Sequence, residues 1–208
     1  MNDLINNLKK FAIDDFPIKT VSKFISQYNF SAKELDSYCF YKKNKYSRNL
    51  VHKEKDFEIL IVCWNPGQGA PIHGHEGEKC WMRVESGALQ ICNYKLDRVN
   101  PLTLTMTDLT KGAAGYLDGP AEIHSVENVY NETAVSLHIY AKPFDKCDIY
   151  DLNEGKYSFK MVIPENFLND EIYLFEFNYR EDYEGDDAFL ISNAGMDLFN
   201  CSSSNFSL

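Results

Sequence analysis

The sequence predicts a mainly β fold, a β-barrel or jelly roll preceded by N-terminal helices. The first forty-odd residues carry apolar side chains at helical spacing. From about Tyr46, short runs rich in β-branched and aromatic residues replace that pattern. Glycine, proline and asparagine break these runs at intervals typical of turns. Many short strands after a helical start favour a barrel or jelly roll with a helical cap.

Two N-terminal segments repeat apolar residues at positions i, i+3, i+4 and i+7, which predicts two amphipathic helices. These residues are Leu4, Ile5, Leu8, Phe11 and Ala12 in the first segment and Val21, Phe24, Ile25 and Tyr28 in the second. Ser31 and Glu34 then have the spacing of a capping box. We therefore expect a third, short helix toward Leu35 and Tyr38.

The strongest strand signal is the run 57–64, which is almost wholly apolar. Further strands are predicted at 80–84, 88–94, 102–108, 113–117, 124–129, 134–140 and 158–163, and another is possible at 171–177. The chain has 208 residues, which suits one domain. We divide it into a helical cap (1–45), a barrel (46–165) and a C-terminal extension (166–208) with an acidic, solvated loop at 181–187.

Charge and composition exclude several partners. The formal net charge of -10 gives no reason to bind nucleic acid or an anionic membrane. No apolar run approaches the roughly 18 residues that span a bilayer, and the N-terminus does not resemble a secretion signal. The six cysteines form no CxxC pair and indicate reduced thiols. We expect a cytoplasmic monomer.

Three histidines predict a metal site. His73 and His75 are one residue apart, so in a strand their side chains share one face. His124 begins the later predicted strand 124–129 and can supply a third imidazole. An HxH pair alone is equally consistent with a structural role. By ligand chemistry, Fe(II) and Zn(II) both suit three imidazoles.

The residues around these histidines have the spacing of the two cupin motifs. Gly67, His73-x-His75, Cys80 and Gly87 match the first motif, and His124 and Asn128 match the end of the second. The order Asp118-Gly-Pro120 departs from the second motif. Cys80 stands where the first motif usually has Glu. The remaining ligands are then neutral, which favours an anionic ligand from the substrate, such as a thiolate.

Within the cupins, the chain resembles the cysteine dioxygenases. The resemblance runs from about Tyr46 to about Asp148 and rests on several segments in order. They are 46–51, 61–64, 73–80, 124–128, 136–140 and 143–147. One departure follows Tyr140, where the family often has Ser-Pro-Pro and this chain has Ala141-Lys142-Pro143.

The resemblance implies a role for each matching residue. His73, His75 and His124 would hold one Fe(II) per chain, and Cys80 would form a thioether with the ring of Tyr140. Ser136, His138 and Tyr140 share one strand face and can form a hydrogen-bond relay. With Cys80 they would form the catalytic group. Arg48 would bind the substrate carboxylate, and we expect Tyr46 to face the same site.

Each of these residues also has a plainer interpretation. Cys80 could be a small buried side chain. The polar face from Ser136 to Tyr140 could belong to an exposed edge strand, and Arg48 could form a surface ion pair of little energetic value.

The function implied by the resemblance is oxidation of L-cysteine by O2 to cysteine sulfinate, as a step of cysteine catabolism and taurine biosynthesis. Two alternative substrates are 3-mercaptopropionate and cysteamine. A different class of function is a cupin that binds metal without turnover, and the simplest is a structural barrel that binds no metal.

Overall fold

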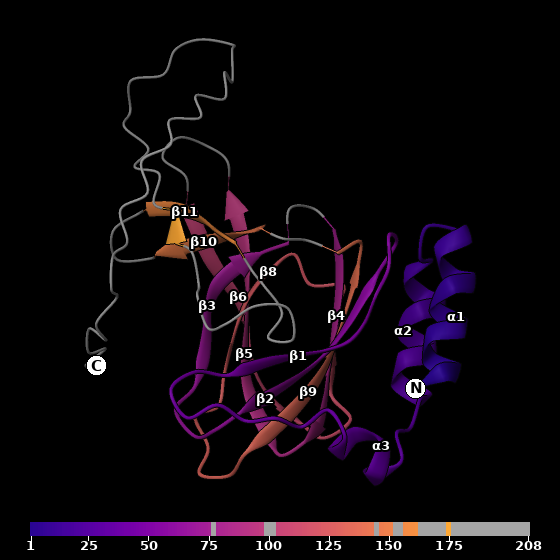
Figure 1. The fold of residues 1–208 in the computed structure, drawn as a ribbon. Coiled ribbons are helices and arrows are strands. Elements are labelled where there is room, and N and C mark those ends of the chain that lie inside the picture. The colour runs from indigo at the N-terminus through magenta and orange to yellow at the C-terminus, as the bar shows by residue number, and fades with distance from the viewer. Residues whose placement is uncertain (76–77, 98–102, 144–145, 152–155, 162–173, 176–208) are drawn as a thin grey trace.

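The computed structural model describes residues 1–75, 78–97, 103–143, 146–151, 156–161 and 174–175. Two antiparallel sheets stand opposite each other, and a pair of helices covers the outer face of one of them (Figure 1). This is the mainly β, cupin-type jelly roll with N-terminal helices that the sequence predicts. The acidic loop at 181–187 and most of the C-terminal extension lie outside the described residues.

The N-terminal helices confirm the helical periodicity. They are α1 (Asn2–Ile13), α2 (Ile18–Gln27) and α3 (Ala32–Asp36). The Ser31 hydroxyl accepts a hydrogen bond from the backbone N–H of Glu34 at 3.3 Å, which caps α3. The Glu34 carboxylate also pairs with the N-terminal amine of Met1. This pair ties α3 to the start of α1.

One sheet has five strands in the order β1-β2-β9-β4-β7. Its strands are β1 (Ser47–Lys53), β2 (Glu58–Trp64), β9 (Ala134–Ala141), β4 (Lys79–Ser86) and β7 (Leu117–Asp118). Every residue of β2 and β9 is buried, because these strands are covered on both faces. The polar residues of β9 are therefore buried, which excludes an exposed edge strand.

The other sheet has seven strands in the order β12-β11-β10-β3-β8-β5-β6. Its strands are β12 (Leu174–Phe175), β11 (Lys156–Met161), β10 (Lys146–Asp151), β3 (Gly69–Gly74), β8 (Ile123–Glu127), β5 (Ala88–Asp97) and β6 (Thr103–Ala113). Strands β3 and β8 pair so that His73 lies opposite His124. This register brings two parts of the sequence about fifty residues apart into contact.

Strand alternation divides the core into two clusters. Val135, Leu137 and Ile139 of β9 point outward and pack with Leu4 and Leu8 of α1. The even-numbered neighbours point inward, toward the second sheet, where apolar residues of both sheets form the inner cluster. That cluster includes Leu60, Val62, Trp64, Met82, Val84, Leu89, Ile91 and Val126. The helices thus cover one face of β9 while its other face is available to the site.

Some strands differ from the prediction. The segment 113–117 is not a strand: β6 continues to Ala113, a turn follows with Gly115 at φ 91°, and only Leu117–Asp118 pair again, as β7. Strand β10 was not predicted, because its charged residues interrupt the alternation of apolar and polar residues that indicates a strand. The five cysteines in the described part of the chain are free thiols, as expected. None of the helices described in the structure is long and apolar enough to cross a membrane.

Candidate metal centre and active site

The three predicted histidines lie together on the adjacent central strands of the seven-stranded sheet and the residue that follows one of them. His73 belongs to β3, His75 follows directly after the end of that strand, and His124 belongs to β8. One ring nitrogen from each lies within 4.8 Å of the other two. His75 and His124 are buried, with exposed fractions of 1% and 0%. This geometry allows three imidazoles to hold one metal ion.

Hydrogen bonds fix the tautomers of His73 and His75. The Nδ1 atom of His73 lies 2.8 Å from the carbonyl oxygen of Pro71, and that of His75 lies 3.1 Å from the carbonyl oxygen of Ala121. A carbonyl oxygen can only accept, so each Nδ1 carries the hydrogen and each Nε2 keeps its lone pair. Burial, with the neighbouring histidines, lowers the pKa of His75 well below its usual value. Neutral imidazoles with a free Nε2 lone pair are the form that binds metals.

His124 is oriented by a carboxylate. Its Nδ1 lies 3.0 Å from Oδ2 of Asp118, and its Nε2 is buried without a hydrogen-bond partner among the described residues. Asp118 ends β7 and begins a turn in which Gly119 has a φ of 123°. A Cβ on Gly119 would lie 2.4 Å from the carbonyl oxygen of Cys80, so only glycine fits here. The turn is recognisable in the sequence, but no function was predicted for Asp118.

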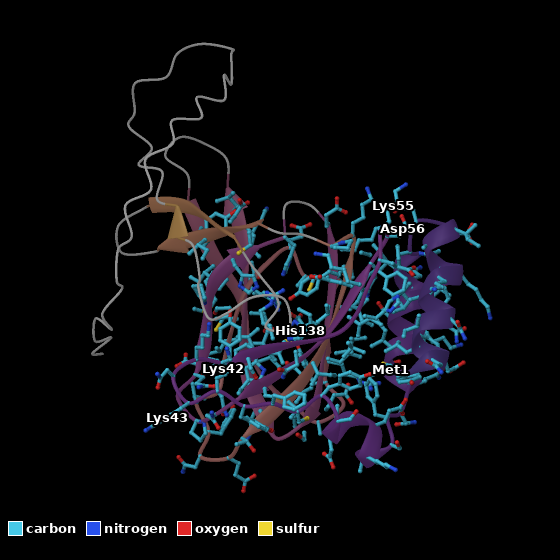
Figure 2. All side chains as sticks on the ribbon, in the orientation of Figure 1. Met1, Lys42, Lys43, Lys55, Asp56 and His138 are labelled. Atoms are coloured by element: carbon cyan, nitrogen blue, oxygen red, sulfur yellow. The ribbon has the colours of Figure 1, made fainter. Side chains whose placement is uncertain are left out.

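The facing strand β9 contributes the predicted polar row. The hydroxyl of Ser136 lies 2.9 Å from Nε2 of His138, and Nδ1 of His138 lies 3.2 Å from the hydroxyl of Tyr140. The indole N–H of Trp64 donates to Ser136 at 2.9 Å and extends the row. Burial and then the charge of Arg48 lower the pKa of His138 well below its usual value. His138 is therefore neutral, and it lies inside the barrel (Figure 2).

Cys80 and Tyr140 are direct cross-strand neighbours on β4 and β9. Both are buried, and the thiol forms a hydrogen bond with Tyr140. Burial raises the pKa of Cys80, so the thiol is protonated at neutral pH. The ring of Tyr140 lies 5.9 Å from that of His75, between centroids. Tyr140 thus links the polar row on one sheet to the histidines on the other.

Arg48 and Tyr46 lie on the same side of the barrel. Arg48 belongs to β1, its side chain is 13% exposed, and its guanidinium carbon lies 5.6 Å from the centre of the Tyr140 ring. Tyr46 stacks on Trp64 with ring centroids 4.6 Å apart. Arg48 is thus largely buried beside Tyr140, which argues against a simple surface ion pair.

An acidic residue that was not predicted from the sequence lies beside Arg48. Glu58, the first residue of β2, is 1% exposed, and its Oε1 lies 3.9 Å from Nη2 of Arg48. Its Oε2 lies 3.8 Å from Nζ of Lys53. A glutamate at the start of an apolar run is easily taken for a solvated end of the strand. The available signal was strand parity, because Glu58 shares its face with the inward-pointing Leu60.

Comparison with known proteins identifies the family of the chain. The protein-family model for cysteine dioxygenase type I matches residues 1–153. The chain belongs to the cysteine dioxygenase type I family. Family membership confirms the resemblance noted in the sequence and makes the chain a member of a family of thiol dioxygenases.

Curated members of the cysteine dioxygenase family match over most of their length. Cysteine dioxygenase type 1 of Rattus norvegicus is 31% identical over 159 residues, which cover 74% of this chain and 80% of the relative. The Homo sapiens enzyme is 30% identical with the same coverage. The Danio rerio enzyme is 28% identical over 167 residues, with coverage of 76% and 82%.

Solved structures similar to this cysteine dioxygenase family member are more distant. TT1209 from Thermus thermophilus is 20% identical with a TM-score of 0.44, and the match covers 55% of this chain and all of that protein. An oxalate oxidase is 17% identical with a TM-score of 0.41, covering 54% and 59% of the two chains.

Proposed function

We propose that the protein is an Fe(II)-dependent dioxygenase that converts L-cysteine and O2 into cysteine sulfinate. One observation carries the proposal: three histidines with Nε2 lone pairs lie opposite a hydrogen-bonded row that ends in Tyr140, in a chain of the cysteine dioxygenase family. The reaction is balanced without another reactant, since both atoms of O2 are transferred to the thiol sulfur.

The donor set suits iron. His73, His75 and His124 offer imidazole nitrogen donors, and the buried Nε2 of His124, which has no hydrogen-bond partner among the described residues, would gain one when a metal binds. Imidazole also suits zinc, but zinc has no redox chemistry, so oxygen transfer favours Fe(II). Bound Fe(II) would lower the pKa of the substrate thiol and bring it together with O2.

Arg48 supports a substrate with a carboxylate. A guanidinium offers two parallel N–H groups to a carboxylate, and its place beside the Tyr140 ring puts that contact next to the metal centre. Both L-cysteine and 3-mercaptopropionate carry a carboxylate, whereas cysteamine does not. Tyr46, stacked on Trp64, would limit the size of the substrate on this side.

The polar row would aim the Tyr140 hydroxyl at the substrate. The indole N–H of Trp64 can only donate, so the Ser136 hydroxyl accepts there, and we assign its own hydrogen to Nε2 of His138. Neutral His138 then donates from Nδ1 to the phenol oxygen. The phenol oxygen of Tyr140 is thereby held in place, and its hydroxyl would interact with the reacting groups from there. Tyr140 would be the catalytic residue, and Ser136 and His138 would position it.

We also propose a thioether between Cys80 and the ring of Tyr140. Their cross-strand pairing supports it, since opposite residues of an antiparallel pair have closely spaced Cβ atoms. The thiol hydrogen and one ring hydrogen would leave with two electrons, and O2 would be the oxidant. The bond would fix the Tyr140 ring. Intact-protein mass spectrometry would detect the loss of two hydrogen atoms, and Cys80→Ser would abolish that loss.

The deciding experiment loads the protein with Fe(II) without oxygen and then adds L-cysteine and labelled O2. Mass detection of cysteine sulfinate carrying both labelled atoms, dependent on iron, is the expected result. Turnover only of 3-mercaptopropionate or cysteamine would replace L-cysteine as the substrate. Iron binding without oxidation of any thiol would favour a non-catalytic metal-binding cupin.

The remaining sequence-based expectations complete the proposal. We propose a monomeric, cytoplasmic enzyme of cysteine catabolism that supplies taurine biosynthesis. We also keep the division into a cap (1–45), a barrel (46–165) and an extension (166–208).

A further inference from the structure

One short turn contacts two of the three histidines. The segment 118–121 begins with the last residue of β7. Oδ2 of Asp118 lies 3.0 Å from Nδ1 of His124, and the carbonyl oxygen of Ala121 lies 3.1 Å from Nδ1 of His75. The backbone N–H of Ala121 also donates to the carbonyl oxygen of Cys80 at 2.9 Å, which fixes the turn to β4. The turn therefore orients two imidazoles, but through acceptors of different charge.

The acceptor of His124 is a carboxylate, whereas Nδ1 of His73 and of His75 faces a neutral carbonyl oxygen. Asp118 is 7% exposed and His124 is 0% exposed, so little water screens the charge of the carboxylate. The effect of this charge extends into the barrel. The pKa of the Cys80 thiol is raised first by burial and then by the charge of Asp118.

Asn93 of β5 holds the second oxygen of this carboxylate. It lies opposite His124 in the sheet, and its side-chain amide donates to Oδ1 of Asp118 at 3.3 Å. Each oxygen of the carboxylate thus faces one N–H group, which is the arrangement that an ionised carboxylate needs. The donor from Asn93 also compensates part of the negative charge that would otherwise act on His124.

An anion beside a metal ligand favours the more highly charged state of the metal. Fe(III) carries one more positive charge than Fe(II), so a nearby carboxylate stabilises Fe(III) more. A carboxylate that accepts from Nδ1 also raises the basicity of the imidazole as a ligand. Both effects lower the reduction potential, which is the free energy of adding one electron to Fe(III).

We propose that the charge of Asp118 sets the reduction potential of the iron centre through His124, and that Asn93 limits this effect. A lower potential makes Fe(II) a better electron donor toward O2. The inference rests on the proposed function only in taking iron as the metal. Asp118 is a positioning residue in this scheme, since it acts through His124 and does not touch the reacting atoms.

The test measures the reduction potential of the iron-loaded protein without substrate, by redox titration followed through the electron paramagnetic resonance of Fe(III). Asp118→Asn keeps an oxygen that can accept from His124 and removes the charge, and the amide of Asn93 can rotate to accept from the new NH2 group. The ratio of Fe(III) affinity to Fe(II) affinity should fall about tenfold, which corresponds to a rise of about 59 mV.

Two further variants separate charge from structure. Asn93→Leu removes the donor to Oδ1 of Asp118 with little change in volume, and its apolar side chain excludes a replacement water. More of the negative charge then acts on His124, so the potential should fall below that of the wild type. Asp108→Asn is the matched control, because Asp108 is an exposed aspartate opposite Asn93 on β6. Its potential should equal that of the wild type.

An unchanged potential in Asp118→Asn would overturn the inference, and so would an equal shift in Asp108→Asn. If Asp118→Asn does not fold or bind iron, Asn93→Leu decides, and a potential at or above the wild-type value would then contradict the role of Asp118. A wild type that binds iron but oxidises no thiol would contradict the proposed function alone, because the titration needs no substrate. A wild type that binds no iron would contradict both.

Discussion

The hydrogen-bond partners of each histidine determine whether one of its ring nitrogens can bind a metal. Pro71, Ala121 and Asp118 each present an oxygen to Nδ1, so the hydrogen lies on Nδ1 and each Nε2 keeps the lone pair that a metal needs. In His138 the partners differ, because Ser136 and Tyr140 occupy both ring nitrogens. Five histidines occur in the sequence, and hydrogen-bond partners separate the metal-binding candidates from the positioning residue.

Asp118→Ala removes the carboxylate that orients His124 and leaves its buried Nδ1–H without an acceptor. We expect iron affinity to fall by about ten- to a hundredfold, the usual effect of losing such a partner. Competition with a chelator measures this affinity. The control is Asp108→Ala, an exposed aspartate on β6, which should bind iron like the wild type. Unchanged affinity in Asp118→Ala would contradict the role of Asp118.

Arg48→Ala removes the proposed carboxylate anchor. The loss of charge-assisted hydrogen bonds is worth about 2–3 kcal/mol, so KM for L-cysteine should rise about 30- to 150-fold. Steady-state kinetics with L-cysteine measure this change, and any oxidation of cysteamine should be affected less. Because Glu58 is buried beside Arg48, circular dichroism must show that the variant is folded. Full activity of a folded Arg48→Ala variant would contradict the assignment.

At the scale of elements, the periodicity of apolar residues predicted the helices, whose formation depends on residues close together in the sequence. The amphipathic pattern located α1 and α2, and the capping box located α3, because helix signals depend on neighbours within one turn. Strand alternation also assigned the two faces of β9 correctly. Strand β10 and the short β7 were not found, since their pairing partners come from distant strands. The burial of a strand residue depends on the strands that pair with its own strand, and the sequence of a single strand does not specify those partners.

Helix α1 should matter for stability. Leu8 is fully buried between α1 and the outer face of the five-stranded sheet. Leu8→Ala should lower the free energy of unfolding by about 2–5 kcal/mol through lost burial and the cavity left behind. Chemical denaturation measures this value. Ile13→Ala at the end of the same helix is the control, because Ile13 is 83% exposed and its loss should cost little.

At the scale of the whole molecule, motif order predicted the site better than any single residue did. His73, His124, Tyr140 and Arg48 were all named from the sequence, and the fold brings them into one region. Trp64, Asp118, Glu58 and Lys53 received no role. Their contacts depend on which residues face each other across strands and between sheets, and the linear sequence does not specify that register.

Metal binding should stabilise the whole fold. A ligand that binds only the folded state adds about 2.7 kcal/mol at a free concentration one hundred times its Kd. Fe(II) should therefore raise the Tm of the wild type. In His124→Ala, which lacks one of the three donors, Fe(II) should leave Tm almost unchanged. A comparable rise in both proteins would show that iron binds elsewhere. His52→Ala, at a histidine outside the cluster, is the control and should keep the full effect.

The two-sided burial of β9 restricts how this enzyme can evolve. Each of its eight residues either faces the helices or belongs to the inner face. Almost any substitution there should therefore lower the stability of the fold or the catalytic activity. A new thiol preference would more easily arise at the outer end of β1, where the side chain of Lys53 is partly open to water. Divergence among relatives with different substrates should therefore concentrate at such rim positions, while β9 stays nearly invariant.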